Sequence, residues 1–144
     1  MDAGTLLALT VACAPQVHVG TAQALGQTER SPTPWAIGLV GGSLYRQPRH
    51  RAEALATAKA LQASGWNFSV GLAQINVGNL GRLGLTIESA FEPCTNLAAM
   101  QAVLVECFDR AGAAAGRAAG HQAAVRRAPS CYYSGKFLTR FRPG

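Results

Sequence analysis

Apolar residues recur at helical spacing in the second half of the chain, and this pattern constrains the fold more than any other feature. The repeating residues are Leu97, Met100, Leu104, Cys107, Phe108 and Ala111. Positions three, four or seven apart share one face of an α-helix. Thr95 and Asn96 are residue types that cap helix N-termini, and Gly112 suits a helix end. The pattern therefore predicts a central, buried helix between these signals.

The first third of the chain predicts two shorter helices. Residues 5–13 are apolar and stop before Pro15, because proline disfavours helix in the residue that precedes it. Residues 21–31 read as a second helix, which Pro32 ends. This helix places Glu29 in its last turn.

A small sheet and another helix are expected next. Two short apolar runs within residues 36–45 flank the Gly41-Gly42 pair, which predicts a β-hairpin. Residues 51–64 are rich in Ala and Leu at helical spacing, and residues 68–70 read as a third short strand. The fold class is therefore mainly α, with a small sheet between the early helices.

Length and charge bound the function without choosing it. A chain of 144 residues suits one compact domain. Its formal charge is +6, and after Asp109 every charged side chain is basic, so that residues 136–144 read as a basic tail. Such a surface could bind nucleic acid, anionic lipid or an acidic polymer such as peptidoglycan, or could simply be solvated. No nucleic-acid-binding motif accompanies it, and no nucleic-acid partner is expected.

The four cysteines bear on crosslinks and metal binding. Cys13, Cys94, Cys107 and Cys131 form no CxxC pair and have no histidine at zinc-ligand spacing, so no metal or other cofactor is expected. Two disulfides or four buried thiols remain. The predicted helix would hold Cys94 and Cys107 roughly 18 Å apart, beyond disulfide reach, which leaves two connectivities.

Residues 6–14 resemble the apolar part of a signal peptide, but Asp2 precedes them and no Lys or Arg does. No apolar run reaches the roughly 20 residues that span a bilayer. The chain is expected to be soluble and, if exported, to begin after its signal or at an incorrect start.

Four motifs follow one another in the order of a known enzyme family. Residues 29–37, E-R-S-P-T-P-W-A-I, resemble the pattern E-S-x-x-x-P-x-A-I, and residues 71–76, G-L-A-Q-I-N, are similar to G-L-M-Q-I-N. Residues 91–97, F-E-P-C-T-N-L, and residues 131–135, C-Y-Y-S-G, resemble the third and fourth motifs. The chain thus resembles the soluble lytic transglycosylases of the lysozyme-like superfamily. Its cysteine-bearing versions, C-A-P, P-C-x-N-L and S-C-Y-Y-S-G, resemble the type IV secretion branch.

The resemblance implies a lysozyme-like fold that cleaves periplasmic peptidoglycan with one acid, Glu29. That residue would protonate the bond between N-acetylmuramic acid and N-acetylglucosamine, and would then accept the proton of the muramic 6-hydroxyl as a 1,6-anhydro ring closes. A helix C-terminus disfavours an ionised carboxylate, which suits a general acid, whereas the neighbouring Arg30 favours ionisation. Glu88 and Glu92 remain as spare acids near the cleft.

The same resemblance assigns the substrate-binding residues. Gln74 and Asn76 suit acetamido and hydroxyl groups because each amide offers two donors and an acceptor, although either could instead satisfy loop backbone. Tyr132 would stack on a sugar or bond Glu29, or else pack in the core. Arg30 is counted with this set.

Two positions depart from the family pattern. Arg30 stands where a serine is expected and Val40 where an asparagine is, which keeps open a protein that binds glycan but cuts it poorly. Of the two disulfide connectivities, Cys13–Cys107 with Cys94–Cys131 is favoured, because Cys94 and Cys131 precede cleft motifs.

The function expected is local opening of the cell wall for a secretion or conjugation apparatus. Its partners would be glycan strands and components of that apparatus. The alternatives are a non-catalytic glycan-binding or assembly protein of the apparatus and a lysozyme-type hydrolase.

Overall fold

The computed structural model describes residues 1–17 and 33–110. Contacts divide the chain into two compact units, Met1–Ala99 and Met100–Gly144. The helix expected over residues 21–31 and the motif around Tyr132 lie outside the described residues. Within the described ranges, no helix is both long and apolar enough to cross a membrane.

Helix α1 (Ala3–Cys13) confirms the first predicted helix. The Asp2 carboxylate caps it by accepting a hydrogen bond from the Thr5 N–H at 2.7 Å. Thr10 is its one buried side chain, and the Thr10 hydroxyl donates to the Leu6 carbonyl at 2.8 Å. The helix ends before Pro15, as the sequence indicates.

Three short strands form an antiparallel sheet in the order β1-β2-β3. Strand β1 covers Ile37–Leu39, β2 covers Phe68–Val70 and β3 covers Ile75–Asn76. Ile37 lies opposite Val70, and Val70 lies opposite Ile75. The small sheet and the strand at residues 68–70 are therefore confirmed.

The hairpin expected around Gly41-Gly42 is wrong, because β1 pairs with β2 and not with the residues that follow the turn. The physical reason is at the other edge of β1. There the Gln47 side chain accepts a hydrogen bond from the Ile37 N–H and donates one to the Ile37 carbonyl, each at 2.9 Å. A side chain thus takes the place of the predicted second strand.

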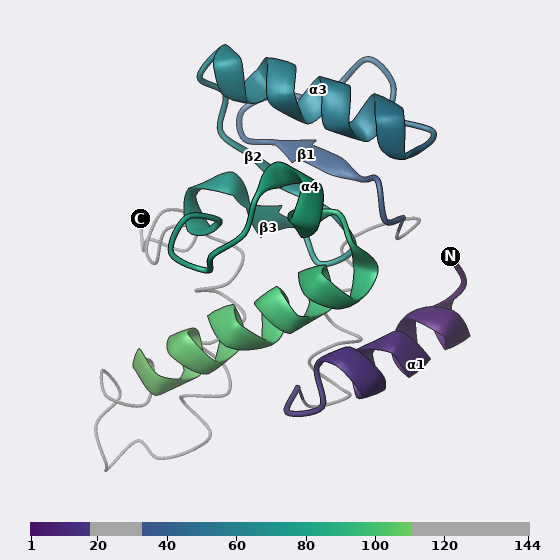
Figure 1. Cartoon of the computed structure of the whole chain (residues 1–144), viewed down its shortest axis with the longest axis vertical. Helices are drawn as coiled ribbons and strands as arrows, with labels where there is room; N and C mark the ends of the chain where they lie inside the picture. The colour runs from purple at the N-terminus through teal and green to yellow at the C-terminus, as the bar shows by residue number, and fades with distance from the viewer. Residues whose placement is uncertain (18–32, 111–144) are drawn as a thin grey trace. The chain divides into compact units, whose positions relative to one another are not determined.

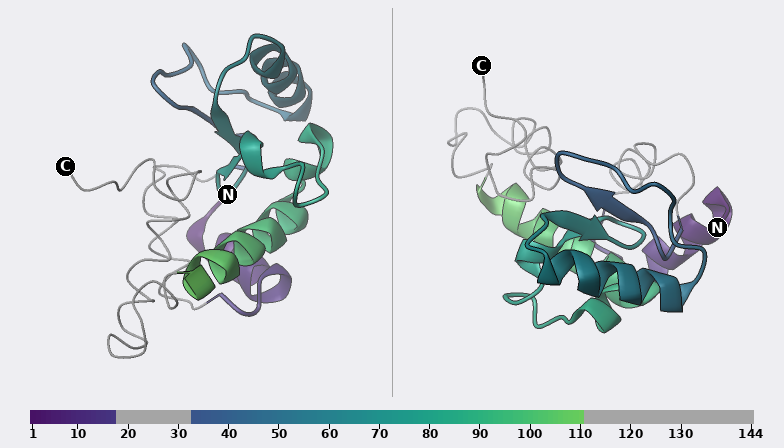
Figure 2. Two further views of the ribbon diagram at one scale, coloured as in Figure 1. Left: turned by 90° about the vertical axis from the view of Figure 1, so that its left-hand side faces the viewer. Right: turned by 90° about the horizontal axis from the view of Figure 1, so that it is seen from above.

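Helix α3 (Arg51–Ala63) confirms the prediction for residues 51–64 and lies beside the sheet (Figures 1 and 2). Its buried residues are Ala54 and Ala58. At its end, the N–H of Gly65 bonds the carbonyl of Gln62 and the N–H of Trp66 bonds that of Leu61. This pair of bonds is a Schellman motif, and Gly65 supplies the positive φ of 78° that the motif requires.

A short connection leads to the predicted central helix. The 3₁₀ helix η1 (Val77–Asn79) and helix α4 (Ile87–Ala90), which carries a Thr86–Ser89 capping box, precede a helix over residues 93–110. Four residues of the predicted apolar stripe are buried, namely Leu97, Met100, Leu104 and Cys107. The helix begins at Pro93, which suits a first position because no N–H is needed there. The predicted Thr95/Asn96 cap is therefore wrong: both residues lie in the first turn.

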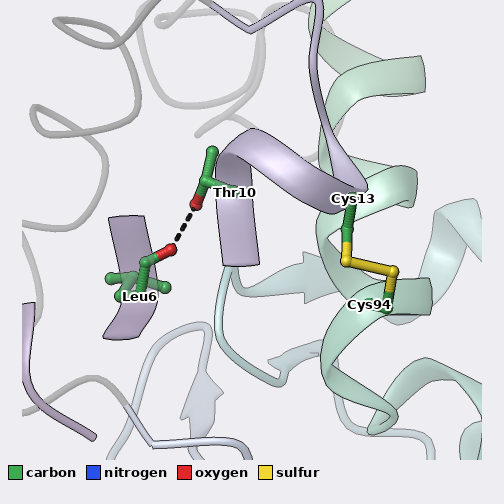
Figure 3. Close-up of a disulfide and its surroundings, with 4 residues drawn as sticks. All are labelled: Leu6, Thr10, Cys13 and Cys94. Atoms are coloured by element: carbon green, nitrogen blue, oxygen red, sulfur yellow. Dashed lines mark hydrogen bonds between the residues drawn. A yellow bond between two sulfur atoms is a disulfide. The ribbon is translucent and has the colours of Figure 1, made fainter. Parts of the chain in front are cut away.

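A disulfide joins Cys13, the last residue of α1, to Cys94 in the first turn of the 93–110 helix (Figure 3). Their Cα atoms are 5.2 Å apart. The preferred pairing of Cys13 with Cys107 is therefore wrong. Cys107 also takes part in a disulfide, with a partner outside the described residues.

Candidate functional site

Two of the predicted site residues, Gln74 and Asn76, fall in the described part of the chain. Glu29, Arg30 and Tyr132 lie outside it. Within the described ranges the candidate site is the turn between β2 and β3, which carries the G-L-A-Q-I-N motif, together with the residues that hold this turn.

The turn has two residues with positive φ. Gly71 has φ 83°, and Gln74 has φ 54°. The Gln74 N–H donates to the Gly71 carbonyl at 3.1 Å and closes the turn. A non-glycine residue in this left-handed region costs about 1–3 kcal/mol, and such strain persists only where the surroundings enforce it.

The Gln74 side chain ties the turn to the start of β1. Its Nε2 donates to the Ala36 carbonyl at 3.1 Å and to the Gly71 carbonyl at 2.9 Å. Its Oε1 faces Gly38, where an added Cβ would lie 2.5 Å from that oxygen. In the described part of the chain Oε1 accepts no hydrogen bond, so what Gln74 can offer a ligand is an acceptor.

Both polar atoms of the Asn76 side chain form hydrogen bonds within the protein. Its Nδ2 donates to Asn67 Oδ1 at 2.8 Å, and its Oδ1 accepts from the Gly78 N–H at 2.9 Å. The side chain is buried and caps η1. Of the two roles that the sequence allows for Asn76, this arrangement favours the structural one.

Asn96 is the residue of this region that sequence reasoning missed, because it was read as a helix cap. It is fully buried, and its Oδ1 accepts from the Ala73 N–H at 2.7 Å. Its Nδ2 donates to the carbonyls of Val70 at 3.0 Å and Ala90 at 2.7 Å. The position of Asn96 within the P-C-x-N-L motif was the signal available.

The two spare acids form ion pairs with α3. Glu88 Oε1 lies 3.0 Å from Lys59 Nζ, and Glu92 Oε1 lies 3.7 Å from Arg51 Nε. The hydrogen bond from the Lys59 side chain lowers the pKa of Glu88 below its ordinary value. A lowered pKa is the opposite of what a general acid needs.

Val40, the second departure from the family pattern, directly follows β1. Its N–H bonds the Asn67 carbonyl at 2.9 Å, and its side chain is 51% exposed. An apolar group is thus presented to solvent where an asparagine was expected.

The chain is similar along most of its length to curated bacterial proteins. It is 45% identical over 136 residues to the type IV secretion system protein virB1 of Brucella abortus, which covers 94% of this chain and 56% of that protein. It is 33% identical over 134 residues to protein virB1 of Agrobacterium fabrum, covering 92% of this chain and 52% of that protein. The chain thus spans about half the length of these relatives. No family model and no solved structure matches it.

Proposed function

Because the chain belongs, over 94% of its length, to the VirB1 family of type IV secretion system proteins, we propose that it is a lytic transglycosylase of periplasmic peptidoglycan. It cleaves the β-1,4 bond between N-acetylmuramic acid and N-acetylglucosamine. The cut opens the cell wall locally for the secretion apparatus. Glycan strands and components of that apparatus are its partners.

In the proposed reaction Glu29 acts first as an acid and then as a base. It protonates the glycosidic oxygen, and the substrate's own N-acetyl carbonyl stabilises the cationic centre at C1. The ionised Glu29 then takes the proton of the muramic 6-hydroxyl, whose oxygen closes onto C1. The product is a 1,6-anhydro ring, and no water is consumed. Tyr132 and Arg30 bind the substrate in this proposal.

The observation that carries the proposal is the conformation of Gln74. A purely structural turn could place glycine at φ 54° and avoid the cost of a side chain there. This chain keeps a glutamine whose two donors hold Ala36 and Gly71 and whose oxygen accepts no bond in the described residues. Backbone strain of this kind gathers at ligand sites. The Gln74 oxygen suits a donor such as an acetamido N–H or a sugar hydroxyl.

The carboxylates near α3 support a single-acid route. Glu88 and Glu92 are each paired with a cation of α3, and Glu53, itself in α3, lies 3.0 Å from Arg49, which precedes that helix. Either of the spare acids, Glu88 or Glu92, would have to leave its ion pair to work beside Glu29 as a second carboxylate. A hydrolase that uses two carboxylates is therefore the less favoured reaction.

The test is digestion of purified sacculi with the wild-type chain and with Glu29→Gln. The wild type should release muropeptides that end in 1,6-anhydromuramic acid, lighter by one water than hydrated products. Glu29→Gln keeps the shape of the side chain and should lower release by about 10²- to 10⁴-fold. Glu92→Gln is the matched control: it removes an exposed carboxylate and should leave release unchanged.

Two results would contradict the proposal. Hydrated reducing ends would identify a lysozyme-type hydrolase and would direct attention to Glu88 and Glu92. Binding of sacculi without release, by the wild type and Glu29→Gln alike, would identify a non-catalytic glycan-binding or assembly protein.

A further inference from the structure

We infer that Asn96 is a positioning residue of the proposed site: its buried amide holds the turn of residues 70–73 and thereby sets the place of Gln74. Asn96 acts through the turn and touches no substrate. The effect of Asn96 on the conformation of Gln74 can be measured by itself, whereas its effect on catalysis rests on the proposed function.

Two of the three hydrogen bonds of Asn96 hold the turn at its two ends. Its Nδ2 holds the Val70 carbonyl, just before Gly71, and its Oδ1 holds the Ala73 N–H, just before Gln74. The remaining Nδ2 bond takes the carbonyl of Ala90, the last residue of α4. One side chain therefore fixes the turn against both α4 and the first turn of the 93–110 helix.

The chemistry of the three partners selects asparagine. Two carbonyls require two donors and one N–H requires an acceptor, and the Asn side chain supplies this set at the right length. Aspartate keeps the acceptor but, when ionised, offers no donor. Leucine has a similar size but would leave three backbone groups without these bonds inside the protein.

The turn is shaped around this amide. A Cβ added at Gly71 would collide with the Asn96 amide and lie 3.2 Å from the Ala90 carbonyl. Glycine at position 71 is thus needed both for its φ of 83° and for the close approach of Asn96. The turn that Asn96 holds therefore also leaves the space that the Asn96 amide occupies.

Gln74 needs such a support because its own conformation is strained. With φ 54°, it would relax to an ordinary conformation if the turn were free to rearrange. Its side-chain bonds to Ala36 and Gly71 depend on the turn staying where it is. Asn96 closes the turn directly before Gln74 and so removes that freedom.

The experiment compares Asn96→Asp with Leu97→Ala in the oxidised protein. Asn96→Asp is nearly isosteric and removes both donors to Val70 and Ala90 when ionised, and at least one of them when protonated. Leu97→Ala removes buried packing from the same helix but no hydrogen bond to the turn. The first readout is hydrogen exchange of the Gln74 backbone amide, which bonds Gly71 and not Asn96. Asn96→Asp should accelerate this exchange about tenfold or more relative to Leu97→Ala, with each rate normalised to global unfolding.

The second readout is release of glycan fragments well below the unfolding temperature. Asn96→Asp should lower kcat/KM while Leu97→Ala does not, and the double variant Asn96→Asp/Gln74→Ala should be no slower than Gln74→Ala alone. Losses that multiply in the double variant would show that Asn96 acts otherwise, since independent sites add in free energy.

The two readouts separate the two ideas. Equal exchange of the Gln74 amide in Asn96→Asp and Leu97→Ala overturns the positioning role, whatever the activity. A wild type that releases no fragment overturns the proposed function, and the exchange comparison still decides the role of Asn96. Should Asn96→Asp not fold, Asn96→Ser, which retains a donor and an acceptor on a shorter side chain, is compared in its place under the same criteria.

Discussion

Gly71 and Asn96 fit each other at the scale of single residues, although 25 positions separate them in the sequence. The glycine lies in a left-handed conformation, and the space where its side chain would be is taken by the Asn96 amide. Gly84 offers a contrast within the same chain. It also has positive φ, 71°, but a Cβ added there would meet nothing within 4 Å. Comparison of Gly71 with Gly84 therefore separates the cost of the backbone conformation from the cost of crowding a side chain.

Gly71→Ala is predicted to destabilise the fold more than Gly84→Ala. Gly84→Ala should lower the free energy of unfolding by about 1–2 kcal/mol, the cost of a left-handed alanine. Gly71→Ala adds a collision with Asn96, and overpacking costs a further amount of about 1–3 kcal/mol. Urea unfolding of the two variants measures the difference. Equal losses would mean that Asn96 moves aside at little cost, against the role assigned to it.

Sequence motifs single out Gln74 as a substrate-binding residue, which stays a prediction, but they do not predict which backbone groups its amide bonds. Its donors bond Ala36, 38 positions away, and a partner so distant along the chain is set by the fold and not by the local pattern. Asn96 was misread for the same reason. Asparagine is a common cap, and the local sequence holds no sign of the buried turn that it meets. The acid Glu29 remains a prediction from the motif.

Helix α3 shows what the sequence predicts well at the scale of one element. Its alanine and leucine spacing predicts a helix over residues 51–64, and the structure confirms it within one residue at the end. The strands were harder. Strand β1 has three residues, and helix α3 separates it in the sequence from its partner β2, so local spacing wrongly predicts pairing with the nearer segment. The bonds from Gln47 to the free edge of β1 could not be read from spacing.

The start of α3 gives a prediction about acid stability. Hydrogen bonds from the Arg49 side chain and then from its backbone N–H lower the pKa of Glu53 from 4.5 to about 2. Because the folded pKa is the lower one, this contribution to stability is fully present above pH 4.5 and is lost as pH falls towards about 2. Glu53→Gln should therefore flatten the decline of the urea midpoint between these pH values.

Arg49→Gln is the matched control for that measurement. It removes the side-chain partner of Glu53 but keeps the backbone N–H of residue 49, so it should flatten the decline in the same pH window less than Glu53→Gln does, and the double variant should do no more than Glu53→Gln. About 1 M salt should shrink the effect because the pair is near the surface. A decline as steep in Glu53→Gln as in the wild type would assign the acid sensitivity to other carboxylates.

Crosslinks act at the scale of the whole molecule. The Cys13–Cys94 bond spans 81 positions of sequence and fastens α1 to the helix turn that also carries Asn96. Helix length correctly excludes a Cys94–Cys107 disulfide, since both residues lie in the 93–110 helix. Choosing between the remaining connectivities was not possible from motif positions, because the choice depends on where α1 packs. An almost uniformly apolar helix gives no pattern that fixes its packing.

The last prediction concerns this connectivity and its stabilising effect. Peptide mapping of the unreduced protein by mass spectrometry should recover Cys13 linked to Cys94, and Cys107 linked to Cys131, the one cysteine that remains. Cys13→Ser/Cys94→Ser opens the long loop without leaving a free thiol from that pair, and should lower the free energy of unfolding by about 2–4 kcal/mol, chiefly by releasing the unfolded chain. Urea unfolding of the double variant against the oxidised wild type measures this, and it leaves the Cys107 disulfide intact, which chemical reduction would not. Recovery of a Cys13–Cys107 peptide would contradict the structure, whereas an unchanged unfolding free energy would mean that the unfolded chain is already compact between residues 13 and 94.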